Sequence, residues 1–371
     1  MKGCAPISEI AHIKMNRYIP ERINKIEEYT PSEGVYSIRL DANENPYKAD
    51  LSELFGDSLS SIDIDRYPDP FAMALRSEFG KCFAVSEDCV AAGNGSDELI
   101  GVIVNLFLEK GDTLAVTKPD FSMYSFYASL SGANVVSEQK SGDMGIDFAS
   151  LRNLVKESGA KLVMFSNPCN PTGLAYDREV ILDFVKSVDC MVVVDEAYME
   201  FCREGCSVID ECEKLDNLIV LKTLSKAYCS AAARIGFAVS NTDVIKAIMK
   251  VKSPYNLNSI SQLLGTKVLR NYPKGYKCDT VVADTKELYK KFLSLEKEGG
   301  YKALPTDANF VLLSFEKEGM AEYIYTELKK RSIIIRMPDK LHLRISCGRS
   351  DENEVFKKAF ESIVCSAKGE K

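Results

Sequence analysis

The sequence contains no tryptophan and only two histidines, His12 and His342, among its 371 residues. Histidine is the usual general acid or base near neutral pH and the commonest metal ligand in proteins. Its scarcity therefore disfavours catalysis by a histidine base and metal sites built from several histidines.

Long apolar runs and basic clusters are also missing. No segment reaches the roughly 18 to 20 uninterrupted apolar residues that a membrane span requires, and residues 1–20 lack the apolar region of a secretory signal. The formal net charge is −7, and no run of Lys and Arg is long enough to bind a nucleic-acid backbone. These absences predict a cytoplasmic protein that binds neither membranes nor nucleic acid.

Cysteine, by contrast, occurs twelve times. In a chain without an export signal, reduced thiols are expected rather than disulfides. The tightest group, Cys202, Cys206 and Cys212, matches no common zinc-binding spacing and has no histidine nearby. We therefore expect no metal site there.

The middle of the chain alternates apolar runs with amphipathic stretches, which predicts an α/β fold. Near-continuous runs rich in Val, Leu and Ile are typical of strands covered on both faces of a largely parallel sheet. They occupy residues 112–116, 161–166, 190–196, 217–223 and 234–240. From about residue 255 longer helical stretches alternate with short strands, which indicates a second, smaller α+β domain. We expect a large domain over residues 44–255 and a small domain formed by residues 1–43 and 256–371.

Three polar motifs follow predicted strands, at the edge where open α/β sheets bind their ligands. The first is SNPCNPTG, residues 166–173. Two Asn-Pro pairs and a glycine indicate a rigid, sharply turned loop. The loop could be only a turn, but it could equally hold the amide of Asn170 in position for a ligand.

The second motif is VVVDEAYMEF, residues 192–201. Asp195 ends an apolar strand, where an unpaired carboxylate is costly to bury, so it needs a cationic partner or a position at the wet strand end. It could also simply cap a following helix. Tyr198, three residues later, could direct its phenol into the same space.

The third motif is KTLSKAYCSAAARIGF, residues 222–237, which sets Ser225, Lys226 and Arg234 among small residues. A lysine in this setting could be a nucleophile that forms a Schiff base, although taken alone it could equally lie on the surface.

An upstream segment, AAGNGSDELI, opens an apolar helix with Gly95, Ser96 and Asp97. The free N–H groups of a helix N-terminus favour an anion such as phosphate. The segment is not a P-loop, because no Gly-Lys-Ser/Thr follows, and a simple capping turn would look the same.

Taken together, these groups match one cofactor. Pyridoxal phosphate offers an aldehyde to a lysine, a ring nitrogen to a carboxylate, a phenolic oxygen to neutral donors and a phosphate to N–H groups and arginine. An amide, a carboxylate with a tyrosine, and then a lysine and an arginine arrive in order from successive units of the sheet. The sequence therefore predicts pyridoxal 5'-phosphate as the cofactor.

The chain resembles the fold-type-I pyridoxal-phosphate-dependent aminotransferases over nearly its whole length, and among them it is most similar to the histidinol-phosphate aminotransferases. The segments that carry the resemblance are YTPSEG, LDANENPY, DRYPDP, GNGSDE, SNPCNPTG, VVDEAYMEF, KTLSKAY with RIGF, SPYNLNSI, DANFVLLSF, and IIIRM with LHLRISCG. The resemblance implies a mostly parallel seven-stranded sheet in the large domain.

The resemblance also implies roles for the motif residues. Lys226 would bind the cofactor aldehyde and move protons at the reacting carbon, and Asp195 would pair with the ring nitrogen. Tyr198 and Asn170 would hydrogen-bond the ring oxygen, and Phe121 would stack on the ring where the family usually has a tyrosine. The cofactor phosphate would be held by Gly95, Ser96, Asp97, Ser225, Arg234 and, in a homodimer, Tyr67 of the partner subunit.

Arg336 and Arg344 stand where the family binds the acidic end of the substrate. A guanidinium group meets phosphate or carboxylate with two parallel hydrogen bonds, although a salt bridge inside the protein is the alternative. Tyr29 and Asn43 would line the substrate side.

The implied reaction moves an amino group from glutamate through the cofactor to a phosphorylated or acidic keto compound, imidazole-acetol phosphate by resemblance. A phosphoamino-acid decarboxylase of the threonine-phosphate decarboxylase type shares the fold, the cofactor and the arginines, so the sequence leaves it open. A cofactor-binding regulator without turnover usually carries a DNA-binding domain, for which this chain has neither the length nor a basic patch.

Overall fold

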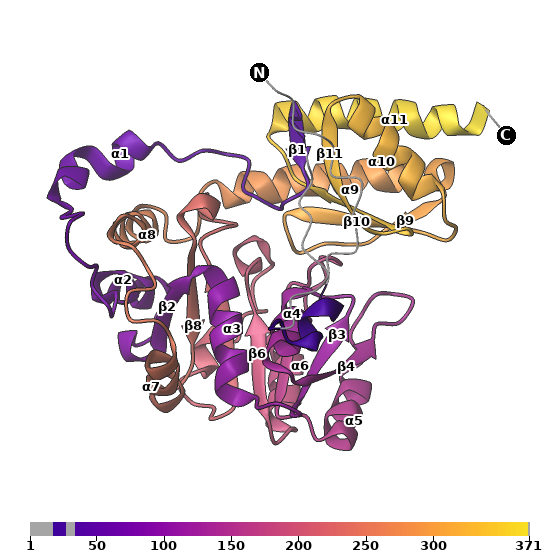
Figure 1. The fold of residues 1–371 in the computed structure, drawn as a ribbon. Coiled ribbons are helices and arrows are strands. Elements are labelled where there is room, and N and C mark those ends of the chain that lie inside the picture. Colours follow the sequence, from indigo (N-terminus) through magenta and orange to yellow (C-terminus); the bar gives the residue numbers. More distant parts are fainter. Residues whose placement is uncertain (1–17, 27–33, 370–371) are drawn as a thin grey trace.

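The computed structural model describes residues 18–26 and 34–369 and contains two sheets in two lobes (Figure 1). The large sheet is built from β2 (Val90–Asn94), β3 (Thr113–Lys118), β4 (Asn134–Gln139), β5 (Leu162–Ser166), β6 (Met191–Asp195), β7 (Leu218–Thr223) and β8 (Ile235–Val239). Its strand order is β2-β8-β7-β6-β5-β3-β4.

The large sheet is parallel except for β8, which runs antiparallel to both β2 and β7. Every residue of β5, β6, β7 and β8 is buried, because helices cover both faces of the sheet. The predicted mostly parallel seven-stranded sheet is therefore confirmed.

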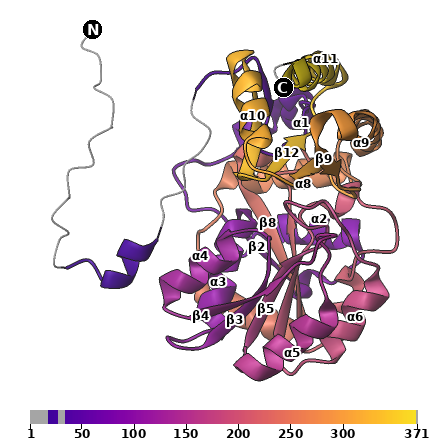
Figure 2. The ribbon, with the colours of Figure 1, turned by 90° about the vertical axis from the view of Figure 1, so that its right-hand side faces the viewer.

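Two layers of helices enclose this sheet (Figure 2). Alternate strand residues such as Val193 face the layer of α3 (Gly95–Phe107), α4 (Met123–Ser131) and α7 (Thr242–Val251). Their neighbours, such as Val192 and Val194, face the opposite layer. That layer contains α2 (Met73–Phe83), α5 (Phe148–Ser158), α6 (Arg178–Lys186) and α8 (Ser259–Asn271).

The small lobe joins the beginning and the end of the described chain. Its strands are β1 (Ile38–Leu40), β9 (Tyr301–Ala303), β10 (Phe310–Phe315), β11 (Ile333–Asp339) and β12 (His342–Ser346), in the order β1-β11-β12-β10-β9. Its helices are α9 (Cys278–Gly299), α10 (Met320–Lys330) and α11 (Ser350–Gly369). β1 pairs in parallel with β11, so an N-terminal segment is part of a largely C-terminal sheet.

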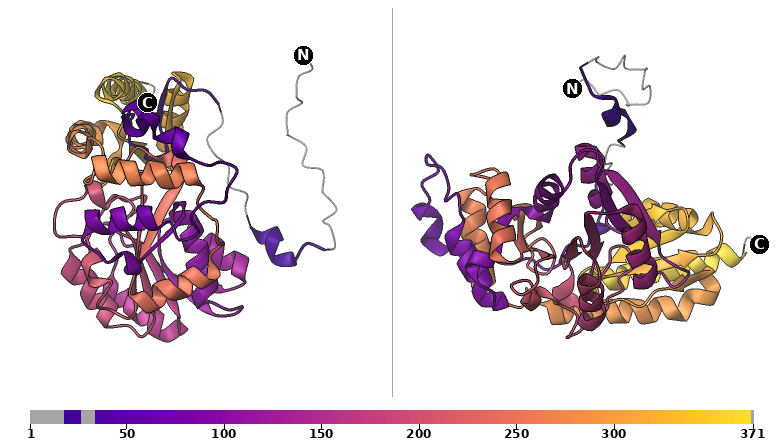
Figure 3. Two further views of the ribbon diagram at one scale, coloured as in Figure 1. Left: turned by 90° about the vertical axis from the view of Figure 1, so that its left-hand side faces the viewer. Right: turned by 90° about the horizontal axis from the view of Figure 1, so that it is seen from below.

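The remaining helices are short. α1 (Leu51–Phe55) contacts α8 at one end of the molecule, opposite the end of α11 (Figure 3). The 3-10 helices are η1 (Glu21–Lys25), η2 (Gly56–Ser61), η3 (Glu87–Cys89), η4 (Met199–Phe201), η5 (Ile209–Glu211) and η6 (Ala231–Ala233). α8 also packs on α2, whereas α9 packs on β9 and β10.

The division of the chain near residue 255 stays a prediction. Within the described part of the chain, no helix is both long enough and apolar enough to cross a bilayer.

Candidate active site

The three sequence motifs meet at one edge of the large sheet. β5, β6 and β7 are parallel, and Ser166 at the end of β5 pairs with Asp195 at the end of β6. Asn170 follows β5 and Lys226 follows β7, so both leave the sheet at the same edge. Parallel strands thus bring together side chains that lie far apart in the sequence, as the sequence analysis predicted.

Asp195 is a buried carboxylate held by neutral donors. Its Oδ2 accepts a hydrogen bond from the Tyr124 hydroxyl (2.9 Å), and its Oδ1 accepts one from the Ala197 N–H (3.1 Å). Burial raises the pKa of Asp195 to about 7, although these two hydrogen bonds act in the opposite direction. A cationic partner would favour the ionised form. A protonated pyridine nitrogen is a partner of this kind.

Lys226 and Tyr198 lie against the N-terminal segment that enters the small lobe. The Lys226 Nζ donates to the Ala42 carbonyl oxygen (2.9 Å) and lies 5.8 Å from the centre of the Tyr198 ring. The Tyr198 hydroxyl accepts from the Asn43 Nδ2 (3.1 Å), and the Ser346 hydroxyl donates to the Asn43 Oδ1 (2.8 Å). Asn43 is thereby fixed beside the lysine, and the Tyr198 hydroxyl keeps its own proton to donate.

Arg234 and two glycines form a compact corner at the N-terminus of α3. β8 is antiparallel, so it begins at the same edge where the other strands end, and Arg234 directly precedes it. Its Nη1 donates to the Ser225 hydroxyl (3.3 Å), and its Nη2 donates to Asp97 Oδ2 (3.3 Å). A Cβ at Gly95, where φ is +78°, would lie 2.5 Å from that Nη2, and one at Gly236 would lie 2.3 Å from a backbone nitrogen of α3. The glycines therefore allow the arginine and β8 to approach the N-terminus of α3, which favours anions.

Arg336 and Arg344 lie directly opposite each other on the antiparallel strands β11 and β12. Like charges in this arrangement are destabilising, and an anion bound between them would offset that cost. Arg344 Nη1 donates to Asn170 Oδ1, and its Nη2 donates to the Asp41 carbonyl oxygen (2.6 Å). Arg344 of the small lobe is thus hydrogen-bonded directly to the loop that follows β5 in the large lobe.

The other three predicted residues are Phe121, Tyr67 and Tyr29. The Phe121 ring lies edge-on to the Tyr124 ring, with centroids 5.6 Å apart. Tyr67 is 80% exposed and stacks on Tyr255, with ring centroids 4.5 Å apart. Tyr29 lies outside the described residues.

The sequence analysis did not select several residues that the structure places at this edge. Tyr124 comes three residues after Phe121, which is nearly one helical turn, so its reach to Asp195 could have been considered. Asp120 comes two residues after β3, near a strand end as Asp195 is. The contribution of the Ala42 carbonyl has no local signal, because any residue type supplies a backbone oxygen.

The sequence profile described as aminotransferase class I and II matches residues 37–360. The chain belongs to this aminotransferase family. It is 35% identical over 351 residues to the histidinol-phosphate aminotransferase of Caldanaerobacter subterraneus subsp. tengcongensis, a match that covers 93% of this chain and 98% of that relative.

Solved structures show the same fold. A histidinol-phosphate aminotransferase from Sinorhizobium meliloti, in complex with pyridoxal-5'-phosphate, matches this aminotransferase with a TM-score of 0.85, 24% identity and coverage of 95% and 99% of the two chains. The L-threonine-O-3-phosphate decarboxylase of Porphyromonas gingivalis matches with a TM-score of 0.74, 22% identity and coverage of 88% and 99%. At these identities the likeness establishes the fold, not the substrate.

The donor set of this aminotransferase fits its cofactor, pyridoxal phosphate. The buried Asp195 carboxylate suits a protonated ring nitrogen, Lys226 supplies an amine, and the corner at Arg234 suits a phosphate. Membership of the family and this fit together confirm the predicted pyridoxal-phosphate-dependent aminotransferase of fold type I. The roles of individual residues remain predictions.

Proposed function

We propose that this aminotransferase transfers an amino group between histidinol phosphate and 2-oxoglutarate, with imidazole-acetol phosphate and glutamate as the other pair of reactants. The observation that carries the proposal is the 35% identity to a histidinol-phosphate aminotransferase over 93% of this chain. The facing Arg336 and Arg344 support it, because two guanidinium groups suit the phosphate of such a substrate.

The chemistry is divided between the cofactor and the protein. Pyridoxal phosphate supplies a ring that withdraws electrons from the substrate Cα. We assign Lys226 the proton transfer at that carbon, because its amine follows β7 at the edge where the three motifs meet. Asp195 keeps the ring nitrogen protonated, while Tyr198 and Asn170 donate to the ring oxygen. Asn43 already occupies one lone pair of the Tyr198 oxygen and so directs its proton elsewhere.

The phosphate of the cofactor is assigned to the corner at Arg234. α3 begins at this corner, and the first N–H groups of a helix have no partner within it. The arginine and a neighbouring hydroxyl add charge and a further donor. The residues assigned to this phosphate are Gly95, Ser96, Asp97, Ser225 and Arg234. Phe121 is assigned to the face of the ring. Tyr29 and Asn43 are assigned to the substrate side.

We propose further that the enzyme is a cytoplasmic homodimer in which Tyr67 of the partner subunit reaches the cofactor phosphate. Large exposed apolar side chains gather on the segments from α1 to α2 and from α7 to α8, which supports an interface there. They are Leu51, Ile64, Tyr67, Phe71, Met73, Val251, Tyr255 and Ile260. The large domain is proposed to span residues 44–255, with the small domain formed by the flanking residues.

The decisive experiment mixes the holoenzyme separately with histidinol phosphate, O-phosphothreonine and O-phosphoserine. We expect histidinol phosphate to convert the cofactor to its amine form, with loss of the visible absorption band, and 2-oxoglutarate to restore that band. Release of carbon dioxide from O-phosphothreonine, without amine-form cofactor from histidinol phosphate, would refute the proposal in favour of a decarboxylase.

A further inference from the structure

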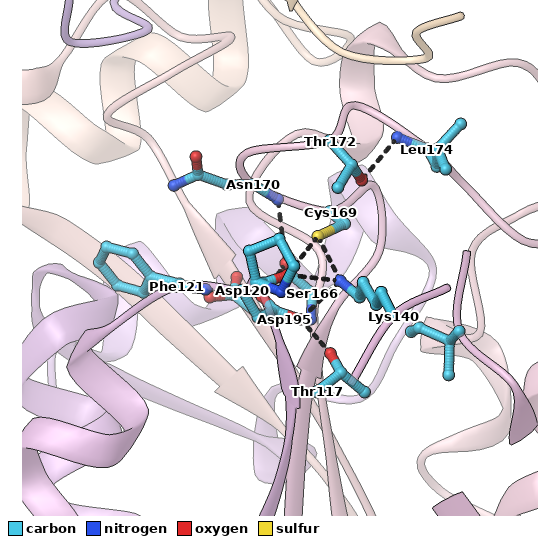
Figure 4. Close-up of polar contacts among 12 residues, drawn as sticks. Thr117, Asp120, Phe121, Lys140, Ser166, Cys169, Asn170, Thr172, Leu174 and Asp195 are labelled. Carbon is cyan, nitrogen blue, oxygen red and sulfur yellow. Dashed lines mark hydrogen bonds and ion pairs between the residues drawn. The ribbon is translucent and has the colours of Figure 1, made fainter. Parts of the chain in front are cut away.

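Asp120 is a buried carboxylate beside residues that are assigned to the cofactor. It stands shortly after β3, and its side chain is 2% exposed. Lys140 directly follows the neighbouring strand β4, its side chain is 1% exposed, and its Nζ lies 3.5 Å from Asp120 Oδ2. Figure 4 shows this pair with Ser166 and Cys169. We call these four residues the Asp120 cluster.

The hydrogen-bonding partners of Asp120 are donors. Its Oδ1 accepts from the Phe121 N–H (2.7 Å) and from the Ser166 hydroxyl (2.5 Å). Its Oδ2 accepts from the Thr117 hydroxyl (2.7 Å), the Ser166 N–H (3.3 Å) and Lys140. An ionised carboxylate can accept all of these hydrogen bonds. The amide of an asparagine at this position would instead direct its own N–H groups against some of the same donors.

Ser166 extends the reach of Asp120 to the cofactor loop. Its single hydroxyl proton is donated to Asp120, so its oxygen is left to accept the hydrogen bond from the Asn170 N–H (3.1 Å). Asp120 therefore holds the backbone of Phe121 directly and the backbone of Asn170 through one hydroxyl. In Figure 4 the side chains of Phe121 and Asn170 lie on the side of the cluster away from Lys140.

Lys140 balances the charge of this carboxylate. Its Nζ donates to the Pro119 carbonyl oxygen (2.8 Å) and lies 2.8 Å from the Cys169 sulfur. Burial alone would lower the pKa of Lys140, but the Cys169 sulfur and the Asp120 carboxylate outweigh it, so the pKa is raised and the ammonium charge is kept. Breaking a buried pair of this kind leaves one charge uncompensated.

We propose that Asp120 is a positioning residue for transamination: held by Lys140, its carboxylate fixes two residues that are assigned to the cofactor, Phe121 at the face of the ring and Asn170 at the ring oxygen. The inference rests on the proposed contacts of these two residues with the cofactor. Asp120 itself acts through them and is not assigned a contact with the reacting atoms.

The test compares holoenzymes carrying Asp120→Asn, Lys140→Met and both changes together. The matched control is Asp112→Asn at the other end of β3, where the carboxylate pairs with Lys161 (2.7 Å). The first readout is the visible circular dichroism of the bound cofactor without substrate, which reports the orientation of the ring. The others are thermal stability and the kcat and KM for glutamate in its exchange with labelled 2-oxoglutarate, which returns the cofactor to its aldehyde form.

We expect Asp120→Asn to reduce the circular dichroism band by at least about half and kcat by about a hundredfold, a typical effect of misplacing a reacting group by about 1 Å. KM should change much less. The double variant should regain thermal stability, because its buried charges are balanced again, while kcat and the band stay low. A double variant that recovers all three, or an Asp120→Asn enzyme within about twofold of wild type, would overturn the proposal.

Ser166→Ala tests the connection to Asn170 if Asp120→Asn does not fold. It removes one hydroxyl and leaves both charges in place, and Ser166→Thr restores the hydroxyl. We expect the alanine variant to lose about tenfold in kcat, the value of one hydrogen bond, and the threonine variant to recover it. A wild-type kcat and band in Ser166→Ala contradict the proposal.

The outcomes separate this inference from the proposed substrate. The dichroism is recorded before any substrate is added, and glutamate is used for the kinetics. If the wild-type enzyme does not react with histidinol phosphate but Asp120→Asn loses the cofactor band, the proposed substrate is refuted and the positioning role is supported.

Discussion

At the scale of single residues, Asp195 shows how a binding site can lower the stability of the empty protein. Burial raises the pKa of its carboxyl to about 7, above the usual value of about 4. The folded, cofactor-free protein therefore holds this proton more tightly than the unfolded chain does. Its free energy of unfolding falls as pH rises from about 4 to about 7, and the loss is complete above that range.

Asp195→Asn removes this titration. We expect the cofactor-free variant to gain stability relative to the wild type between pH 5 and pH 8, by about 3 kcal/mol at most, and to lose transamination. Thermal unfolding of both cofactor-free proteins at the two pH values measures the gain. The exposed Asp189→Asn is the control and should show no such change with pH. An equal difference between variant and wild type at both pH values contradicts the expectation.

Arg336 gives the second prediction at this scale. If it binds the substrate phosphate, Arg336→Met should lower kcat/KM for histidinol phosphate by about a hundredfold, the value of about 3 kcal/mol for charged hydrogen bonds. The kcat/KM for histidinol, which has no phosphate, should change only slightly. Equal losses of kcat/KM for the two compounds would show that Arg336 maintains the protein structure and does not bind the substrate phosphate.

At the scale of elements, the corner at Arg234 depends on the close contact of β8 with the N-terminus of α3. A Cβ at Gly236 would approach two backbone atoms of α3, the Ser96 nitrogen at 2.3 Å and the Gly95 carbon at 2.5 Å. Backbone atoms cannot rotate aside as a side chain can. The strand and helix would have to separate, and the phosphate donors would move with the helix.

Gly236→Ala should therefore reduce both stability, by about 1 to 3 kcal/mol, and the affinity of the cofactor-free protein for pyridoxal phosphate. Gly142→Ala is the matched control, because a Cβ there meets nothing within 4 Å. Urea unfolding and titration with the cofactor measure the two effects. A destabilised Gly236→Ala protein with wild-type cofactor affinity would show that the contact is structural only.

At the scale of the whole molecule, the proposed dimer makes a prediction that a monomer cannot satisfy. Tyr67 is 80% exposed in the isolated chain. If Tyr67 of the partner subunit completes each site, then mixed dimers of Lys226→Ala and Tyr67→Ala chains contain one site with both native residues.

Mixing and reassociating the two variants should restore activity to about a quarter of the wild-type value, because about half of the dimers are mixed and each has one intact site. Activity assays before and after mixing, with the assembly state followed by ultracentrifugation, test this. Activity equal to the average of the two separate variants would mean that the subunits do not share sites.

How much of the fold could be predicted from the sequence depends on whether a local run of residues identifies each element. Buried strands such as β6 are continuous apolar runs, so they were predicted from sequence. β4 lies at the sheet edge and has only one buried residue, Glu138, and β2 contains two alanines and a glycine. Neither has the apolar run by which the central strands were found.

The same distinction applies to the site. Asp195 ends one recognisable strand and Lys226 follows another, and their convergence results from parallel pairing. Lys140 follows a polar edge strand and reaches Asp120 only because β3 and β4 pair with Lys118 opposite Gln139. Register between strands, which no local pattern specifies, decides that contact.

The N-terminal strand β1 also determines when the active site can form during synthesis. Ser37, which precedes it, bonds to Ser332, 295 residues later, and the adjoining carbonyl groups of Asp41 and Ala42 hold Arg344 and Lys226. Strand β1 must therefore wait for a partner that is synthesised about 295 residues later before it can pair. A nascent chain can therefore complete its large sheet, which ends at Val239, before β11 is made, yet it acquires a finished lysine site only after β11 has been synthesised.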